Sequence, residues 1–484
     1  MINYSLLPLR FRRLNGSVLV TNLVGDYLWL NDADFYDLIS GRIHSETNLF
    51  HDLQANFLIS TGDVDFAVDI LATRYRTKKA FLEEFTTLHM VVTTLRCNQS
   101  CSYCQASAKD EDSSDTDMTE STATLVAEMI MRAPSRSIKV EFQGGEPSLN
   151  FKAIETVTER VLELNRTAGK QVEFVICTNL FRTPDHVLDY CRHRNFCIST
   201  SLDGPAEIHD RHRKGGVAGV THARVVEGIE KAACYVGRER IGALMTATRS
   251  SLGHFPAIID EYVRLGLRHI VFRPLNPYGR SVANQSELSY SVQEYMSSVE
   301  EGLRHIVELN RTGINMVEGY TSLLLRRMLT PFPTGYVDLQ SPSGSGISGA
   351  IYNHTGGIYA SDEGRMLAAM GDERFRLGDV RDDYKSVFAG EKLKEIVRHS
   401  IVETLPQCSD CAYRMWCGAD PVRQYAVQKD LVGHKAFCDF CHKHTAHFDL
   451  LLRMLDEGDS TRNILWNWAW GPYRPRGDTA DGHV

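Results

Sequence analysis

Three cysteines, spaced Cys-x3-Cys-x2-Cys, are the residues of this sequence with the clearest capacity for chemistry. Cys97, Cys101 and Cys104 follow residues 90–95, an apolar and β-branched stretch that predicts a buried strand. Three thiolates on one short loop suit a cubane iron–sulfur cluster and leave its fourth iron without a protein ligand. Such an iron can hold the amino and carboxylate groups of a small molecule. The alternatives are core thiols or a zinc site, but structural zinc usually has four ligands and no fourth Cys or His lies nearby.

This loop resembles the signature of the radical S-adenosylmethionine (SAM) enzymes. The resemblance implies a 4Fe–4S cluster on Cys97, Cys101 and Cys104, with SAM bound at the open iron. Cleavage of SAM would then give a 5′-deoxyadenosyl radical, which abstracts a hydrogen atom from the substrate. Tyr103 falls where the family places an aromatic residue against the adenine.

Composition indicates a soluble globular protein of two or three domains. The chain has 484 residues, 43% hydrophobic and 24% charged, with a net charge of −8. This charge argues against nucleic acid or an anionic membrane as a partner. No apolar run approaches the roughly 18 residues of a membrane span, and the N-terminus lacks a signal-peptide pattern. We therefore expect a cytoplasmic protein whose 12 cysteines are metal ligands and core thiols.

Residues 1–85 predict a separate unit. Residues 16–22 and 26–30 read as a hairpin. Residues 31–34 then offer a cap for a helix at 35–39, and further helices are expected near 47–59 and 64–75. This order looks like a winged-helix module and is similar to the leader-peptide recognition domains (RiPP recognition elements) of peptide-modifying enzymes. In those domains a precursor peptide adds a strand to a sheet edge. The alternative is a structural cap on the rest of the chain.

The central part of the chain alternates strands and helices, which predicts a parallel sheet with helices on its outer face. The expected strands are 89–96, 138–143, 171–178, 196–202, 240–247 and 269–274. Six strands match the partial (β/α)6 barrel of the radical SAM family, an α/β fold. In such folds the chemistry sits at the carboxyl ends of the strands, where the remaining motifs fall.

Several residues at these strand ends resemble SAM-binding positions of the family: Gln143, Gly144, Gly145, Glu146, Asn179, Ser199, Ser201 and Arg273. Glu146 commonly steadies the glycine loop, and Arg273 either pairs with the SAM carboxylate or caps the barrel. Asp203 is the candidate catalytic carboxylate, as a base or substrate anchor, unless it only caps the next helix. The string 209–213 is expected to order a loop over the site, and the acidic run 110–117 to be a solvated connection.

A second cysteine group comprises Cys408, Cys411, Cys417, Cys438 and Cys441. It resembles the SPASM extension of peptide-modifying radical SAM enzymes, in which seven cysteines hold two auxiliary clusters. Cysteines expected in the first auxiliary set are missing from 341–346 and replaced at Ser361 and Pro421. The resemblance therefore implies one auxiliary 4Fe–4S cluster on Cys408, Cys411, Cys417 and either Cys441, which we favour, or Cys438. A zinc site on the same thiols is the alternative.

These features predict five segments: a recognition unit at 1–85, the barrel at 86–284, a helical bridge at 285–334, the SPASM-like domain at 335–455 and a tail at 456–484. Over about residues 5–450 the chain is similar to the His-Xaa-Ser system radical SAM maturases. The resemblance rests on residues 6–11, the cluster loop, and residues 142–147, 360–366 and 415–421.

The implied function is modification of a ribosomal precursor peptide, cross-linking above all, with a companion radical SAM protein and an external electron donor as partners. One alternative is a sulfatase-maturase-type enzyme acting on a folded protein. The other is a non-catalytic scaffold that presents the precursor to its companion.

Overall fold

The N-terminal unit contains a small antiparallel sheet. The computed structural model describes residues 4–216 and 219–470, and its first sheet joins β2 (Leu9–Leu14), β3 (Ser17–Asn22) and β4 (Tyr27–Leu30) in that order. The predicted hairpin is formed by β3 and β4. Strand β2 was not expected, because Arg10, Arg12 and Arg13 interrupt its apolar alternation.

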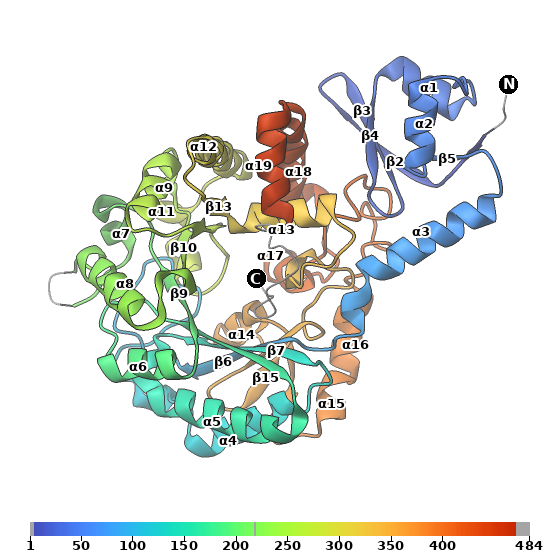
Figure 1. Ribbon diagram of the computed structural model, residues 1–484. Coiled ribbons are helices and arrows are strands. Elements are labelled where there is room, and N and C mark those ends of the chain that lie inside the picture. The colour runs from blue at the N-terminus through green and yellow to red at the C-terminus, as the bar shows by residue number, and fades with distance from the viewer. Residues whose placement is uncertain (1–3, 217–218, 471–484) are drawn as a thin grey trace.

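Three helices complete this unit: α1 (Asp32–Ile39), α2 (Asn48–Ala55) and α3 (Val64–Lys78). Within the predicted capping stretch 31–34, Asn31 caps α1 by accepting a hydrogen bond from the Asp34 backbone N–H. A short pairing of β1 (Ser5–Leu6) with β5 (Ile59–Ser60) closes the unit. Its own core includes Val18, Val20, Phe35, Leu38, Phe50 and Leu53. In Figure 1 α3 leads from this unit down to the rest of the chain.

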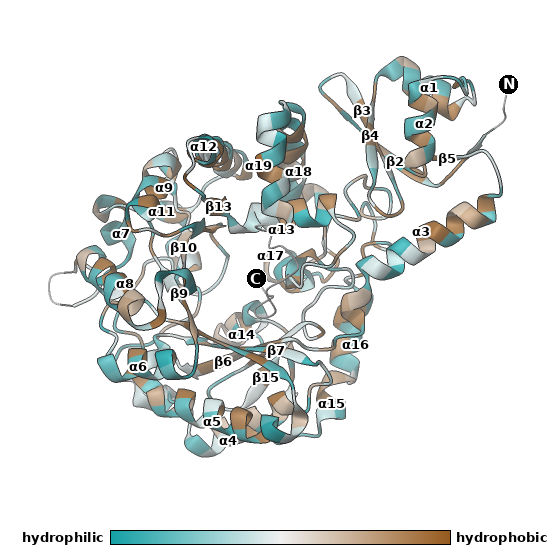
Figure 2. Ribbon diagram, in the orientation of Figure 1, coloured by the Kyte–Doolittle hydropathy of each residue, from teal (hydrophilic) through white to brown (hydrophobic). Residues whose placement is uncertain are grey.

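The main sheet has nine strands in the order β12-β10-β9-β8-β7-β6-β14-β15-β16. Its first part consists of β6 (Leu88–Thr94), β7 (Ser137–Gly144), β8 (Gln171–Cys177), β9 (Cys197–Ser201), β10 (Ile241–Thr246) and β12 (Phe272–Arg273). All neighbours among these six are parallel, as expected for the predicted barrel. Figure 2 shows much of β6 in the colour of hydrophobic residues, which fits a strand covered on both faces.

The outer helices of this part are α4 (Glu120–Met131), α5 (Phe151–Ala168), α6 (Asp185–His193), α7 (Ala206–His212), α8 (His222–Val236) and α9 (Phe255–Arg264). They bury one apolar face against the sheet, as Val126 and Ile130 of α4 do. These apolar faces and the strands share one large core. This core holds the parallel strands side by side, so that their carboxyl ends lie at one edge of the sheet.

The sixth predicted strand is broken, which corrects the expectation of one strand at 269–274. Strand β11 (His269–Ile270) pairs with β13 (Val317–Glu318), whereas β12 pairs with β10. The predicted bridge is not helical throughout, because α10 (Arg280–Ala283), α11 (Gln285–Leu288), α12 (Val292–Arg311) and α13 (Gly319–Leu329) are separate. The Glu318 carboxylate, whose Oε1 lies 3.0 Å from the Phe272 N, ties β13 to β12 and accepts from the first turn of α13.

The C-terminal part extends the same sheet rather than forming a detached layer. Its strands are β14 (Gly349–Tyr352), β15 (Gly357–Tyr359) and β16 (Arg376–Asp379), and β14 pairs in parallel with β6. Its helices are α14 (Asp362–Ala369), α15 (Tyr384–Phe388), α16 (Glu391–Arg398), α17 (Pro421–Gln428), α18 (Asp439–Asp456) and α19 (Asp459–Trp470).

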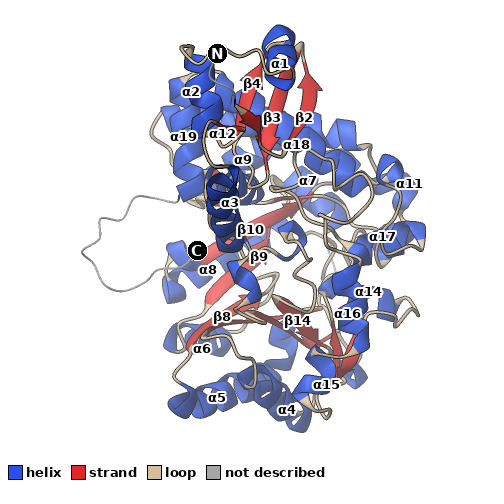
Figure 3. Cartoon of the chain, turned by 90° about the vertical axis from the view of Figure 1, so that its right-hand side faces the viewer, coloured by secondary structure: helices blue, strands red, loops and turns tan. Residues whose placement is uncertain are grey.

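The predicted tail at 456–484 is corrected over its described residues. Residues 459–470 form α19, which buries Leu465, Trp468 and Ala469. It contacts α18, beside which it lies in Figure 1, and α12, next to which it lies in Figure 3. The prediction of a disordered tail beyond Tyr473 lies outside the described residues. No helix in the described part of the chain is long and apolar enough to cross a membrane.

Candidate functional site

The loop of Cys97, Cys101 and Cys104 follows β6 at the carboxyl edge of the sheet. It is held by backbone hydrogen bonds from the Cys97 N to the Lys109 O (3.0 Å), the Ser100 N to the Lys214 O (2.7 Å) and the Ser102 N to the His212 O (2.9 Å). The loop therefore rests on neighbouring strand-end loops and has no regular structure of its own.

The three thiols are close enough to influence one another. Burial raises the pKa of Cys97 to about 12 and of Cys101 to about 11, and the neighbouring Cys104 raises both. All three are partly buried free cysteines. Soft thiolate ligands on one fixed loop fit an iron–sulfur cluster, whose iron would deprotonate them. Across residues 4–216 and 219–470, no three His, Cys, Asp or Glu side chains are grouped as ligands of a single metal ion.

The glycine motif lies against the start of this loop. A Cβ at Gly144 would collide with the Thr94 O, and one at Gly145 with the Arg96 O. The Gly145 N donates to the Thr94 O (2.9 Å), so the ends of β7 and β6 are joined directly. The fit requires glycine at both positions.

Glu146 lies directly after this motif and joins it to the end of β8. Its buried carboxylate accepts hydrogen bonds from the Ser148 Oγ (2.6 Å), the Thr178 Oγ1 (2.8 Å) and the Asn179 N (2.8 Å). Gln143, at the end of β7, differs: its buried Nε2 has no hydrogen-bond partner within the described residues. An unpartnered amide at a strand end is available to a ligand.

The other predicted cofactor-binding residues lie at the same edge but have different neighbours. The Asn179 Nδ2 donates to the Asn98 Oδ1 (2.8 Å) and lies 3.8 Å from the Cys97 Sγ. Ser199 and Ser201 are two residues apart on β9 and therefore share one face of the sheet. Arg273 ends β12, and its Nη1 lies 3.3 Å from the side-chain amide of Gln105, just beyond the cysteine loop.

Asp203 is the anchor of a buried network. Its Oδ2 accepts from the Arg213 Nε (3.0 Å) and from the Tyr103 hydroxyl, and its Oδ1 accepts from the Thr246 N (3.0 Å). Burial would raise the pKa of Asp203, but Arg213 and these hydrogen bonds hold it below its usual value. It does not cap α7, since that helix begins after Pro205 without a side-chain cap. These contacts fix Tyr103, the predicted adenine neighbour, and leave no oxygen of Asp203 free of a partner.

The 209–213 string does hold the cysteine loop. The His212 Nδ1 lies 2.9 Å from the Ser102 Oγ, and its Nε2 lies 2.7 Å from the Ser250 Oγ. The acidic run contains one exception to the expected solvated connection. Asp117 forms an ion pair with Arg96 (2.7 Å) and accepts from the Thr94 Oγ1 (2.6 Å). Sequence reasoning missed Asp117 because only the return of its loop to β6 sets it apart from its acidic neighbours.

The second cysteine group also converges. Burial raises the pKa of the partly exposed Cys417 most, and Cys411, Cys408 and Cys441 each raise it further. Cys438 has other partners: it caps α18, and its Sγ accepts from the Gln424 Nε2 (2.6 Å) and the Cys441 N (3.3 Å). Burial raises the pKa of Cys408 and of Cys441 most, and Cys438 raises both further, so it lies near the same thiols. The choice of Cys441 over Cys438 as the fourth ligand stays a prediction.

Protein contacts occupy the positions where the first auxiliary cysteines are missing. The Ser361 Oγ accepts from the Gly364 N (3.2 Å) and caps α14. Pro421 lies in the first turn of α17, capped by Asp420. The Ser343 and Ser345 hydroxyls lie 3.2 Å apart in a buried stretch. The absence of a first auxiliary cluster stays a prediction from the missing cysteines.

The N-terminal sheet and α13 enclose the 408–417 loop. The Thr21 Oγ1 donates to the Ala412 O (2.9 Å), and the Trp416 Nε1 donates to the Gly25 O (3.1 Å). From α13, the buried Arg327 guanidinium donates to the Trp416, Met415 and Cys417 carbonyls at 2.9, 3.0 and 3.3 Å. The predicted recognition unit is thus also part of the support of the second cysteine group.

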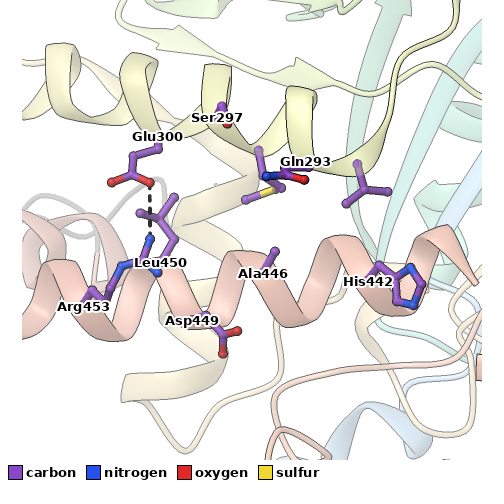
Figure 4. A pocket seen from close by; sticks show the side chains of 10 residues that line it. Gln293, Ser297, Glu300, His442, Ala446, Asp449, Leu450 and Arg453 are labelled. Carbon is purple, nitrogen blue, oxygen red and sulfur yellow. Dashed lines mark hydrogen bonds and ion pairs between the residues drawn. The ribbon is translucent and has the colours of Figure 1, made fainter. Parts of the chain in front are cut away.

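A cleft of about 540 Å³ lies between α12 and α18, away from the cysteine loop at 97–104 (Figure 4). Gln293, Glu300, His442 and Asp449 line it, and Glu300 pairs with Arg453 across it (3.3 Å). None of the predicted SAM-site residues borders this cleft. A second cavity of about 370 Å³ reaches from the loop after β12 to α17 and α18.

Comparison with known proteins finds a family model that matches the part of the chain containing this geometry. Residues 91–246 match the model of the radical SAM superfamily. The cysteine-type anaerobic sulfatase-maturating enzyme of Clostridium perfringens is 21% identical over 346 residues, which cover 66% of this chain and 84% of that protein.

Two solved structures share the fold. Native anSMEcpe with bound AdoMet superimposes with a TM-score of 0.64 at 17% identity, covering 78% of this chain and 99% of that one. Streptococcus suis SuiB bound to its precursor peptide SuiA gives 0.52 at 12% identity, covering 88% and 97%. Residues 91–246, which match the radical SAM model, contain the cysteine loop, the glycine motif and Asp203.

Proposed function

Because this chain is an enzyme with a radical SAM domain, we propose that it is a maturase that modifies a ribosomally synthesised precursor peptide. The observation that carries this proposal is the meeting of the three-thiol loop, Gly144-Gly145 and Asn179 at one edge of the sheet. A 4Fe–4S cluster and SAM bound there would supply hydrogen-atom abstraction from an unactivated carbon. The protein's own residues would hold SAM, through Gln143 and Arg273 among others, and fix Tyr103 through Asp203.

The N-terminal unit is proposed to bind the precursor. Strands β2 and β4 form the two edges of its sheet and each pairs with β3 within the described residues. An extended peptide adds to such an edge through main-chain hydrogen bonds. Phe11, on β2, is 50% exposed and lies beside Phe35 with ring centroids 4.8 Å apart, so it offers an apolar contact to an added strand. Cross-linking of a precursor with His-Xaa-Ser repeats, with a companion radical SAM protein, is the finer form of this proposal.

The test is anaerobic reconstitution followed by addition of SAM, a reductant and the precursor peptide. We expect 5′-deoxyadenosine and a peptide whose mass has changed, and co-expression with and without this protein should give the same mass difference. Formation of neither product would contradict the proposal. Protection of β2 or β4 amides from hydrogen exchange on peptide addition would identify the binding edge.

A sulfatase-maturase-type activity on a folded protein is the second candidate, supported by the sequence similarity to such enzymes. Two matched substitutions separate the candidates. Phe11→Ser alters the sheet edge, whereas Phe66→Ser alters an equally apolar, 67% exposed residue on α3. A precursor maturase should bind its peptide several-fold more weakly after Phe11→Ser alone, while the second candidate predicts the same activity in both variants.

A further inference from the structure

The second cavity, of about 370 Å³, is lined by two cations that form no ion pair within the described part of the chain. They are Arg423 of α17 and Lys443 of α18. The Arg423 Nη1 donates to the Asn276 Oδ1 (2.9 Å), and its other guanidinium nitrogens have no acceptor among the described residues. The Lys443 Nζ lies 5.2 Å from the centre of the Tyr320 ring and has no hydrogen-bond acceptor in the same part of the chain. Both cations therefore keep N–H donors for an anion.

The carboxylates around these cations leave the lining with an excess of positive charge. Asp439 is the one acidic residue among the described residues that line the cavity, and it is exposed in the first turn of α18, where the helix dipole favours its charge. Asp420 caps α17 by accepting from the Arg423 backbone N, not from the guanidinium. Burial lowers the pKa of Lys443 to about 8, and Asp338 and Asp420 oppose this shift, but neither carboxylate lines the cavity.

The cavity is open to solvent, so a ligand can reach the two cations. Val282 of α10, Met370 after α14 and Val427 of α17 line it and are 43, 46 and 53% exposed. The Tyr290 hydroxyl, on the same lining, accepts from the Leu275 N (2.7 Å) and has no acceptor for its own proton among the described residues. A volume of about 370 Å³ is within the range of small-ligand sites. The lining thus suits a group with an aliphatic stem and a negative end.

One wall of the cavity is attached to the first cysteine loop. The Arg280 N donates to the Cys104 O (2.9 Å), and the Asn284 Nδ2 donates to the Ser102 O (2.7 Å). Val282, which lines the cavity, lies between these two attachments. The cavity begins in the loop after β12, at the edge of the sheet where the three thiols lie. A substrate group held there would place its neighbouring carbons close to the site of hydrogen abstraction.

The cavity also continues toward the proposed peptide-binding edge. Val292 lines both this cavity and the cleft between α12 and α18 shown in Figure 4. Asp449 lines the cleft and forms an ion pair with Arg12 of β2 (3.0 Å). A peptide bound at the β2 edge can therefore follow the cleft to the cavity. This continuity identifies a peptide as the carrier of the anionic group.

We propose that Arg423, Lys443 and the Tyr290 hydroxyl bind a carboxylate of the peptide substrate, either an acidic side chain or the C-terminal carboxylate. A guanidinium, an ammonium and a phenol are all hydrogen-bond donors, and one carboxylate accepts from several donors at once. The inference rests on the proposed function for its substrate, a peptide, and adds to it a preference for a negatively charged group near the modified position.

The test measures peptide binding to the reconstituted full chain by NMR saturation transfer. Acetyl-Gly-Glu-Gly-amide is compared with acetyl-Gly-Gln-Gly-amide, and acetyl-Gly-Gly-Gly with a free C-terminus is compared with its amide. At least one carboxylate peptide should bind about tenfold more tightly than its uncharged counterpart, as expected for one charge-assisted contact. The pair that shows the preference identifies the source of the carboxylate.

Two variants and a matched control connect the preference to the cavity. Lys443→Met and Arg423→Gln should each reduce it to less than about threefold, because each removes one charged donor. They are judged separately, so that the second decides if the first does not fold. Lys429→Met is the control, since Lys429 also lies over an aromatic ring, 5.0 Å from the centre of Tyr425, but is 65% exposed and does not line the cavity. It should leave the preference unchanged.

Equal binding of both carboxylate peptides and their uncharged counterparts would overturn the inference. So would a preference that persists in both cavity variants, or one that is lost equally in the control. Formation of 5′-deoxyadenosine and the mass change of the precursor are measured in parallel. If both occur but no preference is found, only this inference fails; if the preference is found without 5′-deoxyadenosine, the proposed function fails and the binding site stands.

Discussion

The cysteine loops at 97–104 and 408–417 each carry three thiols, but different parts of the chain support them. The first rests on the loops around Lys109, His212 and Lys214, all within the matched domain at 91–246. The second is enclosed by the N-terminal sheet and by Arg327 of α13, far away in sequence. Cys438 and Cys441 add further thiols to the second group, whereas the first has three.

This contrast separates two tasks. A loop supported within one domain can keep its geometry while the substrate-binding parts of the chain change. A loop held between the N-terminal unit and the C-terminal part links the positions of these two parts to whether its thiols bind a cluster. Damage to the first loop should therefore abolish chemistry, whereas damage to the second should mainly affect stability and peptide handling.

The largest contrast is expected from removing one thiol of each group. Cys101→Ala should lower SAM cleavage by more than about a thousandfold, to background, because the open iron is lost with its cluster. Cys441→Ala should lower the iron content but retain SAM cleavage without peptide. Quantification of 5′-deoxyadenosine and of iron per chain checks both. Equal SAM cleavage in the two variants would remove the distinction between the groups.

Asp203→Asn should destabilise the first site by about 3 kcal/mol, because it leaves the buried Arg213 without its counter-ion. Tyr103→Phe, which removes only one hydrogen bond of the network, should cost about 1 kcal/mol. Thermal unfolding and SAM affinity measure these effects, and iron at the second group should be unchanged. If Asp203 acts as a base alone, Asp203→Asn would keep full stability and SAM binding and lose only product.

Arg327→Met should destabilise the second loop by about 2 kcal/mol, because three backbone carbonyls lose their donor. The variant no longer buries a charge, and this offsets part of the cost. The cost of burying that charge is visible in the pKa of Arg327, which burial lowers to about 10. Proteolysis between Ser409 and Cys417 should become faster. Unchanged proteolysis together with full iron content would show that the N-terminal sheet alone supports the loop.

The smallest effect concerns Glu363, whose pKa burial raises to about 7. A carboxyl with a raised pKa binds its proton more tightly when folded, so stability falls as the pH rises from about 4.5 to about 7. Glu363→Gln should therefore melt a few degrees higher than the unmodified chain at pH 8 and nearly equally at pH 5. Melting curves of both proteins at pH 8 and pH 5 test this. The same difference in melting temperature at both pH values would mean that the Glu363 carboxyl is exposed to solvent.

Much of the first site could be predicted from the sequence because its residues follow strands in order. Cysteine spacing, the Gly-Gly turn and the position of Asn179 after β8 all depend on local pattern and on parallel strand ends meeting at one edge. Asp117 and the full set of Asp203 partners could not be predicted, since loops and β10 bring them together from distant positions. The break between β11 and β12 was also missed, because two short pairings look like one strand in sequence.

By itself, the sequence determined which residues can hold iron: thiol spacing is a covalent property of the chain, and the missing cysteines at Ser361 and Pro421 can be read directly from it. Only the tertiary structure decided what surrounds those residues. It made Asp203 an anchor of Tyr103 and gave Cys438 to the cap of α18. The physical reason is that ionisation and hydrogen bonding depend on burial and on neighbours from distant segments, and packing alone sets both.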